Sequence, residues 1–341
     1  MKLIAVLLTA VTSFAQNYSA TKTSVDDIEV VRLADKTHET EVSVAPTVGN
    51  IAYEMKVKGA NLFWFPEPLG KFRAGHGLAA NQYLGPWANR LDHDGFRANG
   101  KSYALNPALN NIRRDPNGKP IHGLLTTCPY WRVVSIRADE SGAEVTSRLE
   151  FWKYPDLAAQ FPFAHTVEMT YRLSGGVLEV KTRIENLSTD PMPLVIGYHP
   201  FFQLHDSPRD AWKVHIAARQ HVEITKEALP TGEFKPMDLA DPQPLEGSEV
   251  DDIFADLIRD PDGRATFWVQ GKAQKLSVIY GPKYNTAIVY TPRNSKFVCF
   301  EPMTGVTNGA NLAQAGKYKE LQSIPAGGVW EESYWVSPGG F

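Results

Sequence analysis

The sequence has little cysteine and no excess of charge of one sign. Only two of its 341 residues are cysteine, Cys128 and Cys299, and a chain of this length buries enough surface to fold without disulfides. An oxidising compartment would permit a bridge between them, but two separate buried thiols are the simpler expectation. The 35 Lys and Arg nearly balance the 38 Asp and Glu, for a net charge of −3. This balance argues against binding to nucleic acid or to an anionic membrane surface.

Motifs that would introduce a cofactor or a metal are also missing. The sequence contains no GxGxxG unit between a strand and a helix, no GxxxxGK[ST] loop, no GxSxG elbow and no HExxH pair. Its histidines and cysteines form no cluster with metal-ligand spacing. We therefore expect a protein that works without a cofactor or a metal.

Long hydrophobic runs are absent as well, and the strongest apolar segment lies at the N-terminus. Residues 1–15 read MKLIAVLLTAVTSFA, with a Lys, a short apolar run and small residues before Gln16. This is the layout of a signal peptide, and it is too short to span a bilayer. We expect cleavage after residue 15, a secreted or periplasmic protein with no membrane attachment after cleavage, and a single domain over residues 16–341.

Amphipathic helices are scarce, and residues 311–321 offer only a weak one. Short apolar alternations dominate instead, separated by turn-forming clusters of Gly, Pro, Asp and Asn. Clear examples are Trp131–Ile136, Glu144–Trp152, His165–Leu173, Val177–Ile184, Trp212–Ala217 and Ala287–Tyr290. Regularly spaced short strands of this kind predict an all-β antiparallel sandwich or barrel.

Two segments place polar residues in tight turns. Asn89 and Arg90 follow a Gly-Pro pair and a Trp, and His122 lies between Ile121 and Gly123. The guanidinium of Arg offers a rigid fork of donors and the amide of Asn both donates and accepts, so the pair suits a polyhydroxylated ligand. A surface Asn-Arg pair without function is the simpler alternative for this motif taken alone.

Two further segments place a titratable residue in an apolar run. His199 lies within Ile196–Phe202, and a lone His in such a run is more often a core residue. Pro200 cannot continue the ladder of a central strand, so we expect His199 at a strand end or edge. Glu301 ends the apolar run that begins at Phe297. Burial would raise the pKa of its carboxyl toward neutrality, where a general base works best.

Taken together, these segments resemble the aldose 1-epimerase (galactose mutarotase-like) family. The resemblance rests on the order Ala88-Asn89-Arg90, His122-Gly123, Gly197–Phe202 and Cys299–Pro302, with Asp251–Phe254 between the last two, and it runs from about residue 50 to the C-terminus. It implies an antiparallel β-supersandwich with an open cleft for a free sugar.

The resemblance also implies roles for individual residues. Glu301 matches the general base and His199 the general acid of a mutarotase, which interconverts α and β anomers by opening and closing the sugar ring. The remaining matches are to substrate-binding positions, and they are Asn89, Arg90, His122 and Asp251, with Asp252 as the alternative to Asp251. We expect the Glu301 carboxylate and the His199 ring to face one cleft, separated by about a sugar ring. We also expect a small-molecule sugar as the partner, and a monomer or weak dimer.

The resemblance indicates the reaction type and leaves the preferred sugar open. Ile288 stands where the best-known galactose mutarotases carry a ligand-binding Gln, and a missing amide removes hydrogen bonds to a sugar hydroxyl. A hexose-6-phosphate 1-epimerase is an alternative that Arg97, Arg113, Arg114 and Lys119 would serve. A non-catalytic carbohydrate-binding protein of the same fold is another, which would not need both Glu301 and His199.

Aromatic residues make up 11% of the chain. Most of them are expected to fill the space between sheets. A smaller set is expected to flank the candidate polar residues, and its members are Trp87, Tyr198, Phe201, Phe202 and Phe300.

Overall fold

The structure, a computed structural model, describes residues 17–75 and 77–341. Its main features are two large sheets in which neighbouring strands run antiparallel. The 12-stranded sheet has the order β1 (Tyr18–Val25), β2 (Ile28–Asp35), β3 (Thr40–Ala45), β4 (Ile51–Val57), β6 (Asn81–Leu84), β14 (Gly197–Phe202), β23 (Val298–Met303), β22 (Thr286–Tyr290), β19 (Asp251–Leu257), β16 (Ala218–Ile224) and β17 (Pro230–Pro236), with β5 (Ala60–Asn61) beside β4.

The second large sheet has nine strands and packs against the first. Its order is β18 (Gln243–Pro244), β15 (Lys213–His215), β20 (Ala265–Gln270), β21 (Lys275–Tyr280), β25 (Val329–Gly339), β12 (Val177–Asn186), β11 (His165–Ser174), β10 (Gly142–Glu150) and β9 (Arg132–Asp139). Two small sheets pair β7 (Gly95–Ala98) with β8 (Lys101–Ala104) and β13 (Met192–Leu194) with β24 (Gln322–Ile324). The helices are short, namely α1 (Leu69–Gly75), α2 (Pro155–Ala158), α3 (Gly309–Gln314) and the 3₁₀ turns η1 (Pro107–Leu109), η2 (Phe151–Lys153) and η3 (Arg209–Ala211).

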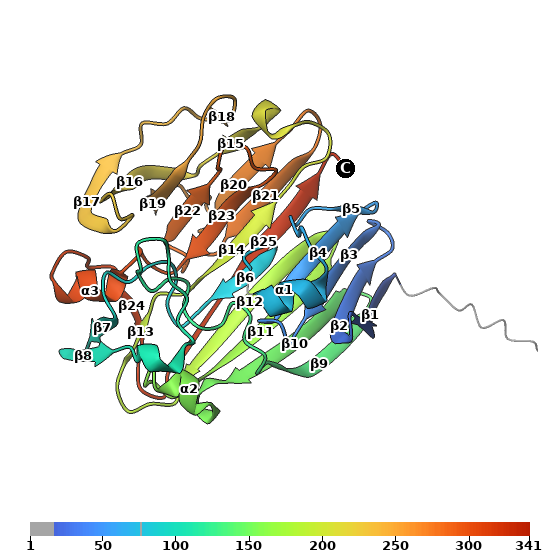
Figure 1. Cartoon of the computed structure of the whole chain (residues 1–341). Helices are drawn as coiled ribbons and strands as arrows, with labels where there is room; N and C mark the ends of the chain where they lie inside the picture. Colours follow the sequence, from blue (N-terminus) through green and yellow to red (C-terminus); the bar gives the residue numbers. More distant parts are fainter. Residues whose placement is uncertain (1–16, 76) are drawn as a thin grey trace, which may run out of the picture.

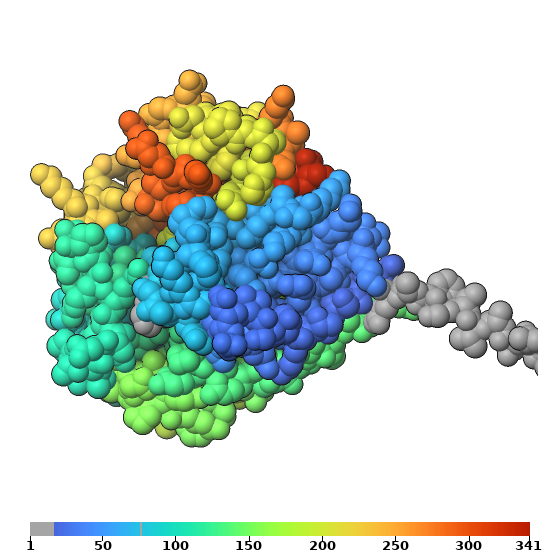
Figure 2. All heavy atoms as spheres, turned by 45° about the vertical axis from the view of Figure 1, so that its right-hand side comes forward, coloured from blue at the N-terminus to red at the C-terminus, as the bar shows by residue number. Residues whose placement is uncertain are grey.

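Strands that are far apart in the sequence lie side by side in the 12-stranded sheet (Figure 1). The early strands β1–β4, drawn in blue, continue through β6 into the yellow-green β14 and the orange β23 and β22. In Figure 2 the residues drawn in cyan and teal lie directly below the later residues in yellow and orange on the face shown. The fold therefore brings β14 and β23, which carry His199 and Glu301, together in the middle of one sheet.

Burial along the strands shows how the two sheets form the core. Residues of β11 and β12 alternate strictly between buried and partly exposed, as in a sheet with one face on the core and one toward solvent. Tyrosines cross the interface between the sheets: the Tyr198 hydroxyl bonds to Thr182 Oγ1, and the Tyr334 hydroxyl donates to Asn81 Oδ1. These bonds join β14 and β6 of one sheet to β12 and β25 of the other, and so they help to set how the two sheets pack on each other.

The expected fold class is confirmed, and the six strands predicted from the sequence are all present with small shifts of their ends. The weak helix appears as α3, shorter and slightly earlier than predicted, because Gly316 takes a positive φ of 74°. Cys128 and Cys299 are both free and buried. The predicted signal peptide lies outside the described residues. Across residues 17–75 and 77–341, the structure contains no helix of a length and apolarity that could cross a membrane.

Candidate active site

His199 and Glu301 lie on adjacent central strands of the 12-stranded sheet. The register that joins Gly197 to Met303 and Phe201 to Cys299 sets His199 on β14 opposite Glu301 on β23. The expectation that Pro200 puts His199 at a strand end or edge is wrong, because His199 lies inside the 6-residue strand β14, which lies between β6 and β23. Pro200 still pairs with Asn81 of β6, and its effect is to interrupt the ladder on the β23 side between Gly197 and Phe201.

The two side chains are in direct contact. His199 Nε2 lies 3.3 Å from Glu301 Oε1, and the side chains are only 8% and 3% exposed. The expected separation of about a sugar ring is therefore wrong. The hydroxyl oxygen and the ring oxygen that exchange protons in anomer interconversion are bonded to the same carbon, so an acid and a base acting on them need to lie close together.

Burial changes the proton affinity of both groups. It raises the pKa of the Glu301 carboxyl well above its ordinary 4.5, with a contribution from the nearby negative charge of Asp251. It also lowers the pKa of His199 to about 3, assisted by the positive charge of Arg113. Glu301 Oε2 and His199 Nδ1 are buried and have no hydrogen-bond partner within the described part of the chain. Each group thus has one polar atom whose hydrogen-bonding capacity the described part of the chain does not use.

The aromatic neighbours of this pair differ from expectation because strand residues alternate between faces. Phe201 shares the face of His199 and stacks on its ring, with centroids 4.4 Å apart. Tyr198, Phe202 and Phe300 point to the opposite face: Tyr198 lies 4.8 Å from Tyr334, and Phe202 lies 6.4 Å from Phe300. Only one of these four strand aromatics therefore touches His199, and the other three belong to the core between the sheets.

Two loops carry Asn89, Arg90 and His122 against β14. An isolated bridge pairs Gly85 with Gly123, and the His122 N–H donates to the Asn89 carbonyl oxygen at 2.9 Å. A Cβ on Gly123, whose φ is +65°, would lie 2.2 Å from the Gly85 carbonyl oxygen. Glycine is thus required where the loops meet.

These loops place one ring and one guanidinium beside the catalytic candidates. The His122 ring meets the His199 ring edge-on at 5.3 Å. Arg90 Nε donates to Asp115 Oδ2 at 2.7 Å, and Arg90 Nη1 donates to Asn89 Oδ1 at 3.1 Å. Burial lowers the pKa of His122 well below 6.5, and the positive charges of Arg113 and Arg90 and the neighbouring His199 lower it further. The His122 ring is therefore neutral near pH 7.

Asp251 lies on the same face of the sheet as His199 and Glu301, at the start of β19. It pairs with Tyr290 across β19 and β22, and Tyr290 pairs with Cys299 on the site face of β23. Although Asp251 is exposed, partial desolvation of its carboxyl raises its pKa, and the positive charge of Arg90 opposes the shift. The neighbouring Asp252 pairs with Val289, a core residue, and its pKa responds to His221 instead. Of the two acids, Asp251 is the one on the site face.

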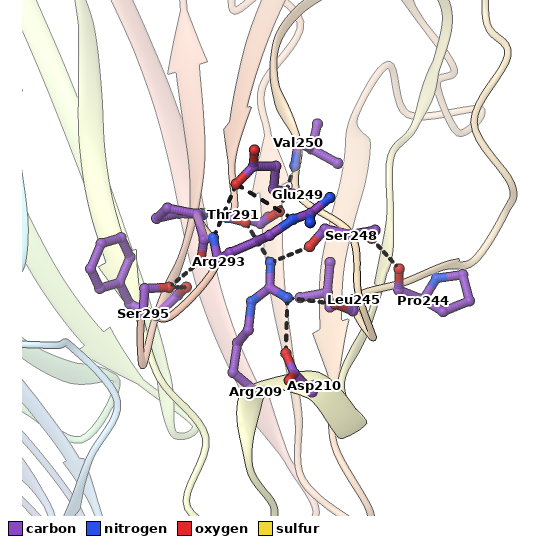
Figure 3. A network of polar contacts seen from close by, with 12 residues as sticks. Arg209, Asp210, Pro244, Leu245, Ser248, Glu249, Val250, Thr291, Arg293 and Ser295 are labelled. Carbon is purple, nitrogen blue, oxygen red and sulfur yellow. Dashed lines mark hydrogen bonds and ion pairs between the residues drawn. The ribbon is translucent and has the colours of Figure 1, made fainter.

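Sequence reasoning missed Arg209, whose buried side chain holds the start of β19 in place (Figure 3). Its guanidinium donates to the carbonyl oxygens of Leu245, Ser248 and Thr291, and Figure 3 shows it surrounded by these groups. Thr291 in turn receives the Val250 N–H on its hydroxyl at 2.9 Å. The segment that leads into Asp251 is therefore fixed by one charged side chain. A Pro-Arg-Asp sequence at the start of a short 3₁₀ turn gives no signal of this role.

The arrangement combines a carboxyl with raised pKa, a neutral imidazole in contact with it, and amide, guanidinium, imidazole and carboxyl groups around them. Such a set can exchange protons with a polyhydroxylated molecule and hydrogen-bond to its hydroxyls. Within residues 17–75 and 77–341, no three side chains of His, Cys, Asp or Glu are grouped so that they could hold a metal ion.

Comparison with known proteins identifies the family of this chain. A sequence model of the aldose 1-epimerase family matches residues 29–337. The chain belongs to the aldose 1-epimerase family. Its resemblance to that family, inferred from the sequence, is thereby confirmed, and membership supports an isomerase of sugars at the level of the family.

Individual members of the family and of the fold are distant from this chain. A galactose mutarotase-like protein from Clostridium acetobutylicum superposes with a TM-score of 0.84 at 20% identity, over 95% of this chain and 99% of that one. Galactose 1-epimerase from Lactobacillus acidophilus NCFM superposes with a TM-score of 0.72 at 14% identity, over 95% and 99%. Uncharacterized protein YihR of Escherichia coli K12 is 26% identical over 186 residues, and the match spans about half of each chain, 54%.

Proposed function

We propose that the protein is an aldose 1-epimerase that interconverts the α and β anomers of a free aldohexose. Glu301 takes the proton of the anomeric hydroxyl while His199 gives a proton to the ring oxygen, and the bond between C1 and the ring oxygen breaks to leave the open aldehyde. After rotation about the C1–C2 bond the roles reverse, and the ring closes as the other anomer. The observation that carries the proposal is the 3.3 Å contact between His199 Nε2 and Glu301 Oε1 on one face of the sheet.

The proton count of the pair fits this cycle. The reaction needs an ionised Glu301 and a protonated His199, whereas burial favours a neutral carboxyl and a neutral ring. These two states contain the same number of protons, so they interconvert by moving one proton across the contact. Hydroxyls of a bound sugar would hydrogen-bond to the charged form and shift the pair toward it. The reactive state then forms when substrate is present.

The remaining residues are proposed to hold the sugar. Asn89, Arg90 and His122 approach from the loops, and Asp251 approaches from the start of β19. Ile288 lies directly opposite Glu301 across β22 and β23 and is 4% exposed. An apolar side chain at this position cannot hydrogen-bond to a sugar hydroxyl. We therefore propose that other residues of the site determine which aldohexose is preferred.

A free sugar is favoured over a hexose 6-phosphate by the partners of the nearby cations. Arg114 donates to both oxygens of Asp94 at 2.7 and 3.0 Å, and Arg90 is paired with Asp115. Lys119 lies 3.0 Å from a carboxylate oxygen of Glu227. Since Arg90, Arg114 and Lys119 already have carboxylate partners, a phosphate group would have to compete for these three cations.

Polarimetry of freshly dissolved sugars tests the proposal. The protein is expected to accelerate the change in optical rotation of α-D-glucose or α-D-galactose toward equilibrium. Glucose 6-phosphate should compete poorly with either sugar. Rotation that changes only at the spontaneous rate with every aldohexose would contradict an epimerase role and favour a carbohydrate-binding one.

The pH dependence of the rate follows from the one-proton requirement of the pair. As pH rises through the upper pKa of the pair, which burial has raised above 4.5, the proton is lost and kcat/KM should fall. On the acid side a second proton binds only near the lowered pKa of His199, about 3. The expected profile, after subtraction of spontaneous mutarotation, has no acid limb near pH 6.5. An acid limb at that pH in a folded protein would mean that an exposed histidine controls the rate.

We also propose that the enzyme acts outside the cytoplasm, where breakdown of polysaccharides releases single anomers. The proposal rests on the signal-peptide layout of residues 1–15. Fractionation of the native host, with immunodetection of the protein, tests it directly.

A further inference from the structure

The His199 ring is held by neighbouring rings. Phe201 stacks on it with centroids 4.4 Å apart, and His122 meets it edge-on at 5.3 Å. Its Nδ1 is buried and receives no hydrogen bond from the part of the chain that the structure describes. In a functional histidine, a hydrogen bond at the second ring nitrogen usually sets which nitrogen carries the proton and how the ring is oriented. The orientation of this ring therefore depends on whatever holds Phe201 and His122.

Gln82 lies beside His199 on the neighbouring strand. The register of β6 and β14 pairs the two residues directly, so their side chains share one face of the 12-stranded sheet. The next pair, Tyr83 and Tyr198, has rings 5.3 Å apart on the opposite face. The Gln82 side chain is completely buried, with an exposure of 0%. It is therefore adjacent to the proposed acid but lies beneath the surface that a sugar could reach.

The Gln82 amide joins two segments of backbone. Its Oε1 accepts the Ala79 N–H at 3.0 Å, and its Nε2 donates to the carbonyl oxygens of Thr126 at 3.1 Å and Gly77 at 3.3 Å. The amide oxygen and the amide nitrogen are thus both used, as burial of an amide requires. Residues 77–80 and the segment that carries Thr126 are connected through this one side chain.

The first segment holds Phe201. The Ala80 carbonyl oxygen accepts the Phe201 N–H at 2.8 Å, and the Ala80 N–H donates to the Trp64 carbonyl oxygen at 2.9 Å. Ala80 has a positive φ of 50°, a conformation that a non-glycine residue keeps only where its surroundings enforce it. The bond between Ala79 and Gln82 lies directly before this residue and helps to enforce it.

The second segment holds His122. The Leu124 N–H, between His122 and Thr126, donates to the Gly85 carbonyl oxygen at 2.7 Å. His122 itself has a positive φ of 63°, so its backbone is also in a conformation that needs support from both sides. The bond from Gln82 to Thr126 supplies that support at the far end of the segment.

We infer that Gln82 is a positioning residue, which orients the His199 ring by holding Phe201 and His122 against it. The inference rests on the proposed function, in which His199 gives a proton to the ring oxygen of the sugar. That transfer requires Nε2 to point at one oxygen, and a displacement of about 1 Å can lower a rate by about 10²-fold. Gln82 itself exchanges no proton and touches no substrate.

Gln82→Leu removes all of these hydrogen bonds and keeps a side chain of similar size. In this variant, kcat for α-D-glucose or α-D-galactose, followed by polarimetry, is expected to fall by about 10–100-fold. KM should change by less than about threefold, because Asn89, Arg90 and Asp251 keep their places. Loss of an acid's orientation is a loss in the transition state, which general loosening of the fold would not confine to kcat.

Gln160→Leu is the matched control. The Gln160 side chain is also 0% exposed, and its amide likewise bonds in both directions, accepting from the Asn106 N–H and donating to the Asn106 carbonyl oxygen and to Asn111 Oδ1. Its loss should lower the free energy of unfolding in urea by an amount comparable to that in Gln82→Leu. It should nevertheless leave kcat within about twofold of the parent protein.

The orientation of the ring can be measured without a substrate. NMR of protein with isotope-labelled histidine, with the His199 signal assigned from His199→Asn, reports how far the stacked Phe201 ring shields the protons of His199. In Gln82→Leu the signal should move toward that of free histidine, and in Gln160→Leu it should stay in place. Such a shift in a protein whose parent epimerises no sugar would remove the proposed function and leave the positioning role of Gln82.

Gln82→Glu tests the inference if Gln82→Leu does not fold. A protonated carboxyl can accept from Ala79 and donate to Thr126, and burial favours that form. At low pH this variant should keep the parental His199 signal and kcat, and both should depart from the parental values at the same pH as the carboxyl ionises and loses its donor.

Three results would overturn the inference. The first is a folded Gln82→Leu variant with a parental His199 signal, or with a parental kcat where the parent protein is active. The second is an equal loss of kcat in Gln82→Leu and Gln160→Leu. The third is a Gln82→Glu variant that matches the parent protein at every pH at which it is folded.

Discussion

Glu301→Gln is expected to reduce kcat for anomer interconversion by about 10²–10⁴-fold. The amide has nearly the shape of the carboxyl but cannot accept the proton of the anomeric hydroxyl. The fold should be retained, because Glu301 Oε2 has no partner in the described part of the chain that the change would break. Burial already favours the neutral carboxyl, so a neutral amide introduces no new electrostatic cost. Polarimetry gives the rate, and thermal unfolding gives the stability.

A matched control makes the same chemical change away from the site. Glu179 on β12 accepts a hydrogen bond from Ser333 Oγ at 2.7 Å, and Glu179→Gln should leave kcat within about twofold. His199→Asn should resemble Glu301→Gln, and the double variant should lose little more than either single variant, since residues that act as a unit are strongly non-additive. A near-normal rate in Glu301→Gln would exclude Glu301 as the base.

Arg209→Met is expected to lower the free energy of unfolding by about 3–5 kcal/mol. The guanidinium is nearly buried and bonds to three carbonyl oxygens, and methionine leaves those oxygens without their charged donor. The same change should raise KM more than it lowers kcat, because the freed segment leads into Asp251 and leaves His199 and Glu301 in place. Urea unfolding and steady-state polarimetry measure the two effects.

The comparison variant for this prediction is Arg219→Met. Arg219 forms an exposed ion pair with Asp256 of β19, and exposed pairs contribute little to stability. Arg209→Lys should recover part of the stability, since an ammonium group can still donate to some of the carbonyls. If Arg209→Met kept the stability and the KM of the parent protein, the buried guanidinium would have no positioning role.

The strands of this fold could be predicted because each carries its own signal. Alternating apolar residues and turn-forming clusters are local properties, and they located His165–Leu173 and Val177–Ile184 to within a few residues. The contact between His199 and Glu301 depends on which strands become neighbours, and residues so far apart in the sequence carry no local signal of their register. The family resemblance supplied that pairing, but their direct contact became clear only from the geometry.

Other errors came from applying a local rule to a residue whose neighbours were unknown. Pro200 indicated a strand end or edge, but the sheet accommodates it within a central strand by interrupting one ladder. Tyr198 and Phe300 were expected beside the polar groups because they are adjacent in sequence, although adjacent residues of a strand face opposite ways. The role of Arg209 could not be predicted, since its partners are backbone carbonyls of distant loops.

The division of the site between strands and loops affects how such a protein can diverge. His199 and Glu301 lie on central strands whose every residue is buried, so most changes near them disturb the core. Asn89, Arg90 and His122 lie in loops, where substitutions and insertions are tolerated more readily. If the proposed function holds, the sugar that is accepted can therefore change over evolutionary time by mutation of the loops, while the proton transfers at the anomeric carbon are inherited with the sheet itself.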